Sequence, residues 1–378
     1  MAKLEEDLAA LKVIVATTSA VIAQLQTSIC GTENKTPQSD SVPDIDALKL
    51  AQDSAALIRA HSTKLSLLII NKPFTATAIS TVLRELIAGP LPGLASAVEL
   101  CNAAQYTKAM SVELQWRAKK VFSEFATLVK TIPLNGQVLG NDEKNGRGST
   151  VGKGSLASTG VVWEACDTVI ELEKLGIAGL MIKKAEQYRD LLKDALEELQ
   201  EWGEEQSDDE DNDEGRADDS DDEGVDKGGQ DDMDNIFGSQ LHIPSEDPNK
   251  IRPRLESALK RLRLIILMYQ ALVKRRLKTL PPLRSKVQLE PGTTTMETPE
   301  IISCLDTAMS LLNKVPHITD ELASSFYELD KTEIDQKIKE CVSTSIAAAK
   351  LLEKSWKGAE DEFTTWSQKF EVNIQKGQ

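Results

Sequence analysis

A glycine-rich stretch near the middle of the chain is the first candidate for chemistry, because such loops can cradle phosphate groups. Residues 146–154 read Gly-Arg-Gly-Ser-Thr-Val-Gly-Lys-Gly. A phosphate-binding loop needs four residues between its glycines and a Ser or Thr after the lysine. Here five residues separate Gly146 from Gly152, and Gly154 stands where the hydroxyl should be. We therefore interpret residues 135–158, which are rich in Gly, Asn and Ser, as a flexible loop.

Side chains that commonly act in catalysis or metal binding are scattered along the chain. None of the three histidines lies in a zinc-binding spacing: His61, His242 and His317. Five cysteines lie far apart, which predicts reduced, mostly buried thiols: Cys30, Cys101, Cys166, Cys304 and Cys341. The sequence shows no nucleophile with a neighbouring base. We predict no enzymatic activity, no metal and no cofactor.

A basic stretch offers a binding surface instead. Residues 250–286 hold 12 Lys or Arg and one acid, Glu256, a net charge of +11. The candidate partner-binding residues are Lys260, Arg261, Arg263, Lys274, Arg275, Arg276 and Lys278. Such a stretch can be the solvated face of an ordinary bundle helix, a nucleic-acid or nuclear-import patch, or a membrane-surface helix. The last ranks lowest, because the bundle needs the apolar side of the helix.

An acidic stretch precedes these bases. Residues 204–234 contain 17 Asp or Glu and two bases, a net charge of −15 in a chain whose total is −16. Dense like charge with little to bury predicts a disordered linker. Because +11 and −15 adjoin in the sequence, we hypothesise that the linker folds back and shields the basic stretch. Unchanged polyanion binding after removal of residues 204–234 would contradict this idea.

The acidic stretch also repeats one short motif. Ser-Asp-Asp-Glu occurs at 207–210 and again at 220–223. An acid at the third position after a serine is what acidophilic kinases accept, and each phosphate adds about −1.5 to −2 of charge. We predict phosphorylation of Ser207 and Ser220, and phosphate mapping of the native protein tests it.

Apolar residues recur with helical periodicity over most of the remaining chain. One apolar seam recurs at steps of four and three residues: Leu4, Leu8, Leu11, Val15, Thr18, Ile22, Leu25 and Ile29. A second seam occupies the basic stretch: Leu255, Leu259, Leu262, Ile266, Tyr269, Val273 and Leu280, with Arg276 in one slot. Further helices are predicted over 44–70, from beyond the Lys72-Pro73 break to 88, and over 94–132 with an interruption near Tyr106. The remaining predicted helices are 158–175, 177–202, 300–314, 318–330 and 332–372.

No sustained strand pattern is present, so the predicted fold is all-α. We expect antiparallel bundles of four or five helices in two halves joined by the linker. The predicted domains are an N-terminal bundle at 1–203, the linker at 204–245 and a C-terminal helical region at 246–378. The longest apolar runs, 65–70 and 264–268, are too short to span a bilayer, so we expect a soluble intracellular protein with no membrane partner.

Two segments carry a family resemblance. Residues 160–167 read Gly-Val-Val-Trp-Glu-Ala-Cys-Asp, and residues 193–199 read Lys-Asp-Ala-Leu-Glu-Glu-Leu. Together with the acidic spacer and basic helix that follow, they resemble the cyclin-D-binding protein family, also called Grap-and-cyclin-D-interacting proteins. The resemblance implies packed helical bundles without catalysis, located in nucleus and cytoplasm. It also implies partners among D-type cyclins and helix–loop–helix transcription regulators.

These observations favour a regulatory interaction protein in cell-cycle and transcription control, with its contact surface on residues 254–278. Two alternatives share the same features. An acidic chaperone would bind basic proteins such as histones through the linker. A cytoskeletal module of the vinculin or talin type would have the same helical architecture. Nucleic-acid binding is a further, weaker alternative.

Overall fold

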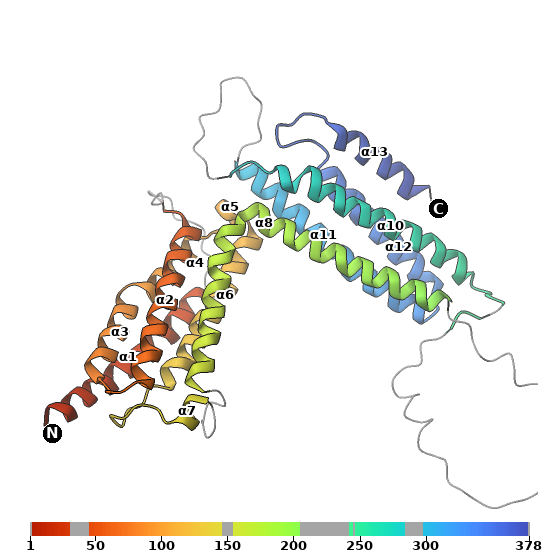
Figure 1. The fold of residues 1–378 in the computed structure, drawn as a ribbon. Coiled ribbons are helices and arrows are strands. Elements are labelled where there is room, and N and C mark those ends of the chain that lie inside the picture. The colour runs from red at the N-terminus through yellow and green to blue at the C-terminus, as the bar shows by residue number, and fades with distance from the viewer. Residues whose placement is uncertain are drawn as a thin grey trace, which may run out of the picture. The chain divides into compact units, whose positions relative to one another are not determined.

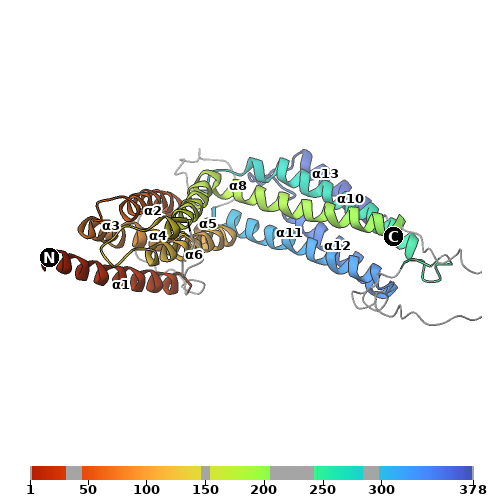
Figure 2. The ribbon, with the colours of Figure 1, turned by 60° about the horizontal axis from the view of Figure 1, so that its bottom comes forward.

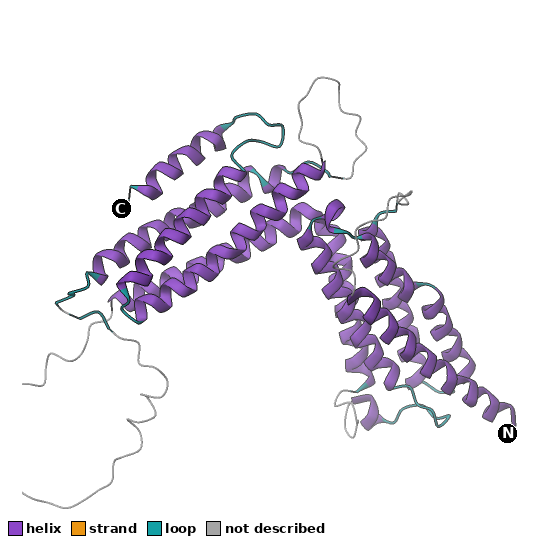
Figure 3. Ribbon diagram, turned by 180° about the vertical axis from the view of Figure 1, so that it is seen from behind, coloured by secondary structure: helices purple, strands orange, loops and turns teal. Residues whose placement is uncertain are grey.

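The computed structural model describes residues 2–30, 45–145, 154–204, 242–244, 246–283 and 298–376. Every regular element in these ranges is a helix (Figure 3), which confirms the all-α prediction. The helices divide into two compact units, which we call unit 1 (residues 1–180) and unit 2 (residues 181–378). Most of the acidic linker lies outside the described residues, as do residues 146–153 of the glycine-rich loop.

Unit 1 is a helical bundle. Its helices are α1 (Ala2–Cys30), α2 (Ala47–Ile70), α3 (Ala76–Ala88), α4 (Pro90–Leu100), α5 (Ala103–Tyr106), α6 (Lys108–Lys130), the short α7 (Asn141–Asn145) and the first part of α8 (Ser155–Glu204). Helix α2 packs on α3 and α4, and α1 packs on α3, α4 and α6 (Figure 1). Asp46 begins α2 by accepting hydrogen bonds from the backbone N–H groups of Leu48 and Lys49. This is the capping that orphan N–H groups in a first turn require.

Helix α1 follows the predicted seam from Leu8 onward, whereas Leu4, the first residue of the seam, is exposed. Leu11, Thr18, Ile22 and Ile29 are buried, while the outer face of the helix stays exposed, with Val13 the most open large apolar side chain. By length and composition, residues 3–30 would suffice to cross a membrane, a property that the sequence reading missed by considering only unbroken apolar runs. In the bundle, the seam of α1 packs against neighbouring helices.

Helix α8 enters both units. Its backbone is non-helical at Gly176 (φ 60°, ψ −171°), a conformation open essentially only to glycine. The sequence predicted two helices that meet at this point. The boundary between the units falls just beyond it, at 180/181, whereas the sequence placed it at residue 203. Residues 181–204 therefore belong with the C-terminal helices, and the acidic linker connects two helices of the same unit.

Unit 2 combines the second part of α8 with α10 (Ile251–Arg275), a 3-10 turn (Leu277–Thr279), α11 (Thr298–Tyr327), α12 (Lys331–Leu351) and α13 (Glu362–Gln375). Helices α11 and α12 form a hairpin, and α10 packs on α12 and α13 (Figure 2). Trp202 of α8 packs against Phe326 and Tyr327 of α11, with ring centroids 6.1 and 5.5 Å away. Tyr327 also donates a hydrogen bond to Glu198, 2.8 Å away.

Two helix boundaries in unit 2 differ from the prediction, and each difference coincides with a contact between segments far apart in the sequence. Helix α11 continues through Pro316, where two helices were expected. Proline lacks the N–H that would bond the Leu312 carbonyl. The Tyr269 hydroxyl of α10 donates to that carbonyl instead, at 2.5 Å. Conversely, the predicted helix 332–372 is interrupted between Leu351 and Glu362, where the chain wraps around Arg276.

Candidate partner-binding groove

The seven basic residues predicted to bind a partner occupy very different surroundings. Five are exposed: Lys260, Arg263, Lys274, Arg275 and Lys278. Arg261 and Arg276 are buried, with 9% and 1% of their surface exposed. Among the exposed residues, Arg263 donates to Gln200 of α8 and Arg275 pairs with Glu362 of α13. The basic stretch is therefore not one continuous patch, because a helix packed on two sides exposes only part of its circumference.

Arg276 holds unit 2 together from inside. Its guanidinium donates to the carbonyls of Leu352 and Glu353 at 2.7 Å each and forms two hydrogen bonds with Asp361 at 2.8 and 2.9 Å. It also stacks over the ring of Phe363, 4.5 Å from its centroid. These contacts use the donors of the guanidinium, so the Arg276 side chain is committed to the fold and has no surface to offer a partner.

The pairing with Arg276 makes the Asp361 carboxyl more acidic. The hydrogen bond from Arg276 is the main cause that lowers the pKa of Asp361 from 3.8 to about 2. A depressed pKa stabilises the fold above pH 4, and that contribution is lost as the pH falls from about 4 to about 2. We expect Asp361→Asn to be less stable than the natural chain at pH 6, with the difference shrinking toward pH 3. Urea unfolding at each pH measures it, and a pH-independent difference would contradict the assignment.

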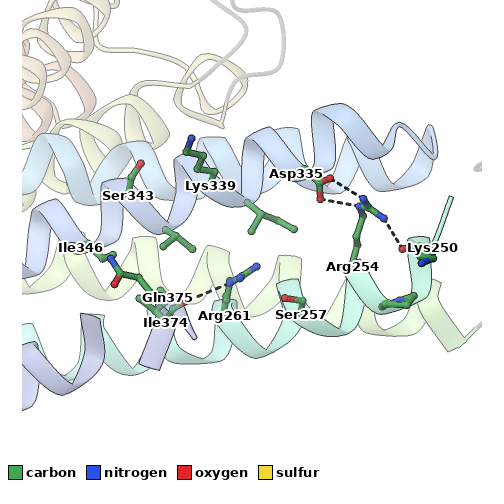
Figure 4. A pocket seen from close by; sticks show the side chains of 13 residues that line it. Lys250, Arg254, Ser257, Arg261, Asp335, Lys339, Ser343, Ile346, Ile374 and Gln375 are labelled. Atoms are coloured by element: carbon green, nitrogen blue, oxygen red, sulfur yellow. Dashed lines mark hydrogen bonds and ion pairs between the residues drawn. The ribbon is translucent and has the colours of Figure 1, made fainter. Parts of the chain in front are cut away.

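A groove lies beside the N-terminal half of α10. It has a volume of about 640 Å³ and lies between α10, α12 and the C-terminal end of α13 (Figure 4). Its apolar lining comes from all three helices: Pro253, Ile338, Val342, Ile346 and Ile374. Its charged lining contains four bases and one acid: Lys250, Arg254, Arg261, Lys339 and Asp335. The groove thus combines an apolar wall with an excess of positive charge.

One acid in the groove is already neutralised. Asp335 accepts two hydrogen bonds from Arg254, at 2.8 and 2.9 Å, in the bidentate geometry that suits arginine and a carboxylate. This pair raises the pKa of Arg254. Arg254 also donates to the carbonyls of Asn249 and Lys250. The pair fixes the start of α10 against α12, and it leaves the other three bases of the groove without Asp335 as a counter-ion.

Arg261 is the buried base of the groove. Its Nε donates to the Ile374 carbonyl at 3.3 Å, in the last turn of α13, where positive charge offsets the helix dipole. The rest of the guanidinium points away from that carbonyl (Figure 4). Among the described residues, no carboxylate lies within 4.0 Å of it. Burial lowers the pKa of Arg261, because a desolvated cation is disfavoured.

Sequence reasoning missed much of this groove. It named Arg261, but it did not list Lys250 and Arg254, which also lie in the basic stretch 250–286, among the partner-binding residues. It also did not connect α12 to the basic stretch. A signal was present in α12, because Ile338, Val342 and Ile346 recur every four residues. That spacing indicates a helix stripe, but it does not reveal whether the stripe faces the core or a groove.

The remaining basic residues border a second hollow. Lys274 and Arg275 line a space of about 470 Å³ between the end of α10 and the start of α13, together with Leu267 and Trp366. Arg275 is already paired with Glu362 there, at 2.8 Å. The second hollow therefore offers less free charge than the groove beside Arg261.

The predictions about phosphorylation and metal binding concern other parts of the chain. Ser207 and Ser220 lie outside the described residues, so their phosphorylation stays a prediction. In the described ranges, no group of three or more His, Cys, Asp or Glu could hold a metal ion.

Comparison with known proteins agrees with the resemblance seen in the sequence. Residues 51–205 match the family model described as Grap2 and cyclin-D-interacting, N-terminal. This segment is therefore similar to the N-terminal domain of that family. The matched segment runs from α2 to the end of α8, so it contains most of unit 1 and the first helix of unit 2. The groove beside Arg261 is built from helices beyond it.

A protein from Schizosaccharomyces pombe, described as uncharacterized, is also similar. It is 28% identical over 160 residues, which cover 42% of this chain and 44% of that protein. The match therefore spans less than half of either chain.

Of the two segments that carry the resemblance, residues 160–167 lie in unit 1 and residues 193–199 lie in unit 2. Trp163 stacks under Arg59 of α2, 5.4 Å from the ring centroid, and Arg59 pairs with Asp167 at 3.0 Å. Cys166 is fully buried. Arg59, Trp163 and Asp167 fasten α8 to α2, whereas Cys166 lies in the core.

Thiol labelling should separate the cysteines by burial. Burial raises the pKa of Cys166 and of Cys341 to about 12, so neither thiol ionises near neutral pH. Cys30 is exposed. We expect iodoacetamide at pH 7.5 to alkylate Cys30 in the native protein, and Cys166 and Cys341 only in urea. Peptide mass mapping measures it. Alkylation of native Cys166 at the rate of Cys30 would show that its site opens.

Proposed function

We propose that this protein is a non-enzymatic regulatory factor that binds partner proteins through helical surfaces. Its field of action is control of the cell cycle and transcription, in nucleus and cytoplasm. The family of residues 51–205 supports binding to a protein partner of the cyclin or helix–loop–helix type. The observation that carries the proposal is the groove beside Arg261, which combines apolar side chains with three bases that form no ion pair with any residue that the structure describes.

The groove has the composition expected of a protein-binding surface. Arginine is enriched where partners make strong contacts, and the centres of interfaces are apolar. Four aliphatic side chains of the groove lie on α12 and α13: Ile338, Val342, Ile346 and Ile374. Lys339 and Ser343 are exposed along the same helix, as expected for a polar rim. A partner with apolar and acidic side chains would complement both parts.

Direct binding measurements test this function. Purified D-type cyclin and a helix–loop–helix regulator are titrated into the full chain by calorimetry, at 50 and 500 mM NaCl. We expect binding by at least one of them that survives high salt, because apolar contacts are not screened. Absence of binding by both would refute the proposed partner class.

The same experiment separates the alternatives. A histone dimer bound through the acidic linker would be released at 500 mM NaCl, and an isolated peptide of residues 204–234 would compete for it. Binding to actin filaments by co-sedimentation would favour a cytoskeletal module instead. Either result, combined with no binding of the regulatory partners, would replace the proposed function.

A further inference from the structure

We propose that the groove beside Arg261 receives an acidic amphipathic helix of the partner, with a carboxylate at Arg261 and apolar side chains against α12. This inference rests on the proposed function and makes its partner chemistry specific. The match to the family model ends at residue 205, before the helices that form the groove. Three features of the groove support the inference: its apolar lining, its positive charge and the burial of Arg261.

The apolar wall has the dimensions of a short helix. Ile338, Val342 and Ile346 stand at successive steps of four residues along α12, a span of about 12 Å at 1.5 Å per residue. Ile374 of α13 and Pro253 of α10 also line the groove. A helix that docks in a groove presents anchors at i, i+3 or i+4, and i+7. Two turns of such a helix would match the three side chains of α12.

The charge of the groove calls for an acidic occupant. Asp335 is engaged by Arg254, and among the described residues Lys250, Arg261 and Lys339 have no ion-pair partner. Three positive charges therefore surround an apolar surface. Acidic residues on the flanks of a docked helix would neutralise them, and their complementarity would select acidic segments over basic ones.

Depth distinguishes Arg261 from the other bases. Only 9% of its surface is exposed, and its one hydrogen bond is to the Ile374 carbonyl. A buried charge without a counter-ion is costly, and a carboxylate can satisfy a guanidinium with two parallel hydrogen bonds. A single side chain can reach this depth. A nucleic-acid duplex instead engages bases that stand out from a surface along its phosphates, so the geometry favours a protein segment.

A designed peptide provides the probe. It is a 14-residue helix of Leu, Glu and Ala, acetylated and amidated, with leucines at i, i+4 and i+7 and glutamates flanking them. A fluorescein label reports binding to the full chain by anisotropy in 150 mM NaCl. The first control peptide carries Gln at each Glu, and the second carries Ser at each Leu. A double-stranded oligonucleotide of similar length tests the other class of polyanion.

Charge reversal at two exposed lysines gives a matched pair of variants. Lys339→Glu changes a base that lines the groove, and Lys260→Glu changes an exposed base of α10 that does not line it. We expect Lys339→Glu to weaken peptide binding about tenfold or more, and Lys260→Glu to change it less than about twofold. Val342→Asp should also abolish binding, because it places a carboxylate within the apolar wall.

Arg261 requires a check on folding, because it also contacts α13. Arg261→Gln should reduce affinity for the glutamate peptide while leaving the weaker binding of the glutamine peptide unchanged. Arg261→Lys should restore part of the loss. Circular dichroism melting of each variant shows whether α13 remains in place. A loss of affinity for both peptides in a folded Arg261→Gln protein would mean that no carboxylate meets this residue.

Several results would overturn the inference. Equal binding of the two charge variants would mean a nonspecific electrostatic effect, and equal binding of the glutamine peptide would remove the role of charge. Preferential binding of the oligonucleotide, lost in Lys339→Glu, would assign the groove to nucleic acid. If Lys339→Glu and Val342→Asp bind the regulatory partner as the natural chain does, the inference fails while the proposed function stands.

Discussion

Replacing Arg276 by alanine is expected to lower the free energy of unfolding of unit 2 by about 3–5 kcal/mol, the cost typical of breaking a buried ion pair from one side. The substitution leaves the carbonyls of Leu352 and Glu353 without donors and Asp361 without its guanidinium. It also removes the stacking on Phe363. The segment between α12 and α13 would then lose the anchor that holds it.

Lys278 provides the control for this substitution. It lies two residues further along the chain and is exposed, so Lys278→Ala should change stability by less than about 0.5 kcal/mol. Arg276→Lys should recover only part of the loss, because an ammonium cannot reproduce the fork that reaches two carbonyls and a carboxylate. Urea unfolding followed by circular dichroism measures all three variants. Equal stability of the Arg276→Ala and Lys278→Ala proteins would contradict the structural role.

The sequence contained a signal for the role of Arg276, but the net charge of the stretch concealed it. Periodicity placed Arg276 in a slot of the apolar seam of α10, whose other members from Leu255 to Val273 are all buried. A base in such a slot must be buried and paired. Its partner could not be predicted, because Asp361 lies 85 residues further along the chain in a segment that was predicted to be helix.

Helix existence was predictable because amphipathic periodicity is a local property. The helix break at Gly176 also followed from sequence, since glycine marks positions that other residues avoid. The continuation of α11 through Pro316 did not, because it depends on the Tyr269 hydroxyl, which belongs to another helix. The groove is beyond local reasoning for the same reason: α10, α12 and α13 meet only in the folded bundle.

The division into units shows most clearly what could not be predicted from the sequence. An apolar stripe on residues 177–202 predicts that this helix is buried on one side, but not which bundle buries it. The acidic linker favoured a boundary at residue 203, because composition changes there. In the structure the boundary lies at 180/181 instead, because the end of α8 packs on unit 2. Trp202, Glu198 and Gly203 contact residues of α10 and α11. The linker is therefore an insertion within unit 2 rather than a connection between units.

Replacing Trp202 by alanine tests that division. Trp202 is 3% exposed and packs on Phe326 and Tyr327. Truncation of a buried tryptophan to alanine typically costs about 3–5 kcal/mol, because it removes apolar contacts and leaves a cavity. We expect this loss to fall on unit 2. Hydrogen exchange measured by mass spectrometry should show reduced protection in α10–α13, with α2 and α6 unchanged.

Trp116→Ala is the matched control, since it makes the same chemical change at a side chain of α6 that is 59% exposed. We expect it to alter stability by less than about 0.5 kcal/mol. The helices that lose hydrogen-exchange protection in Trp202→Ala show to which unit residues 181–204 belong. If Trp202→Ala loosened α2 and α6 while α10–α13 kept their protection, residues 181–204 would belong to the N-terminal bundle, as the sequence alone suggested. Loss of protection confined to α10–α13 would show that the segment matched by the family model, residues 51–205, extends into a second folding unit.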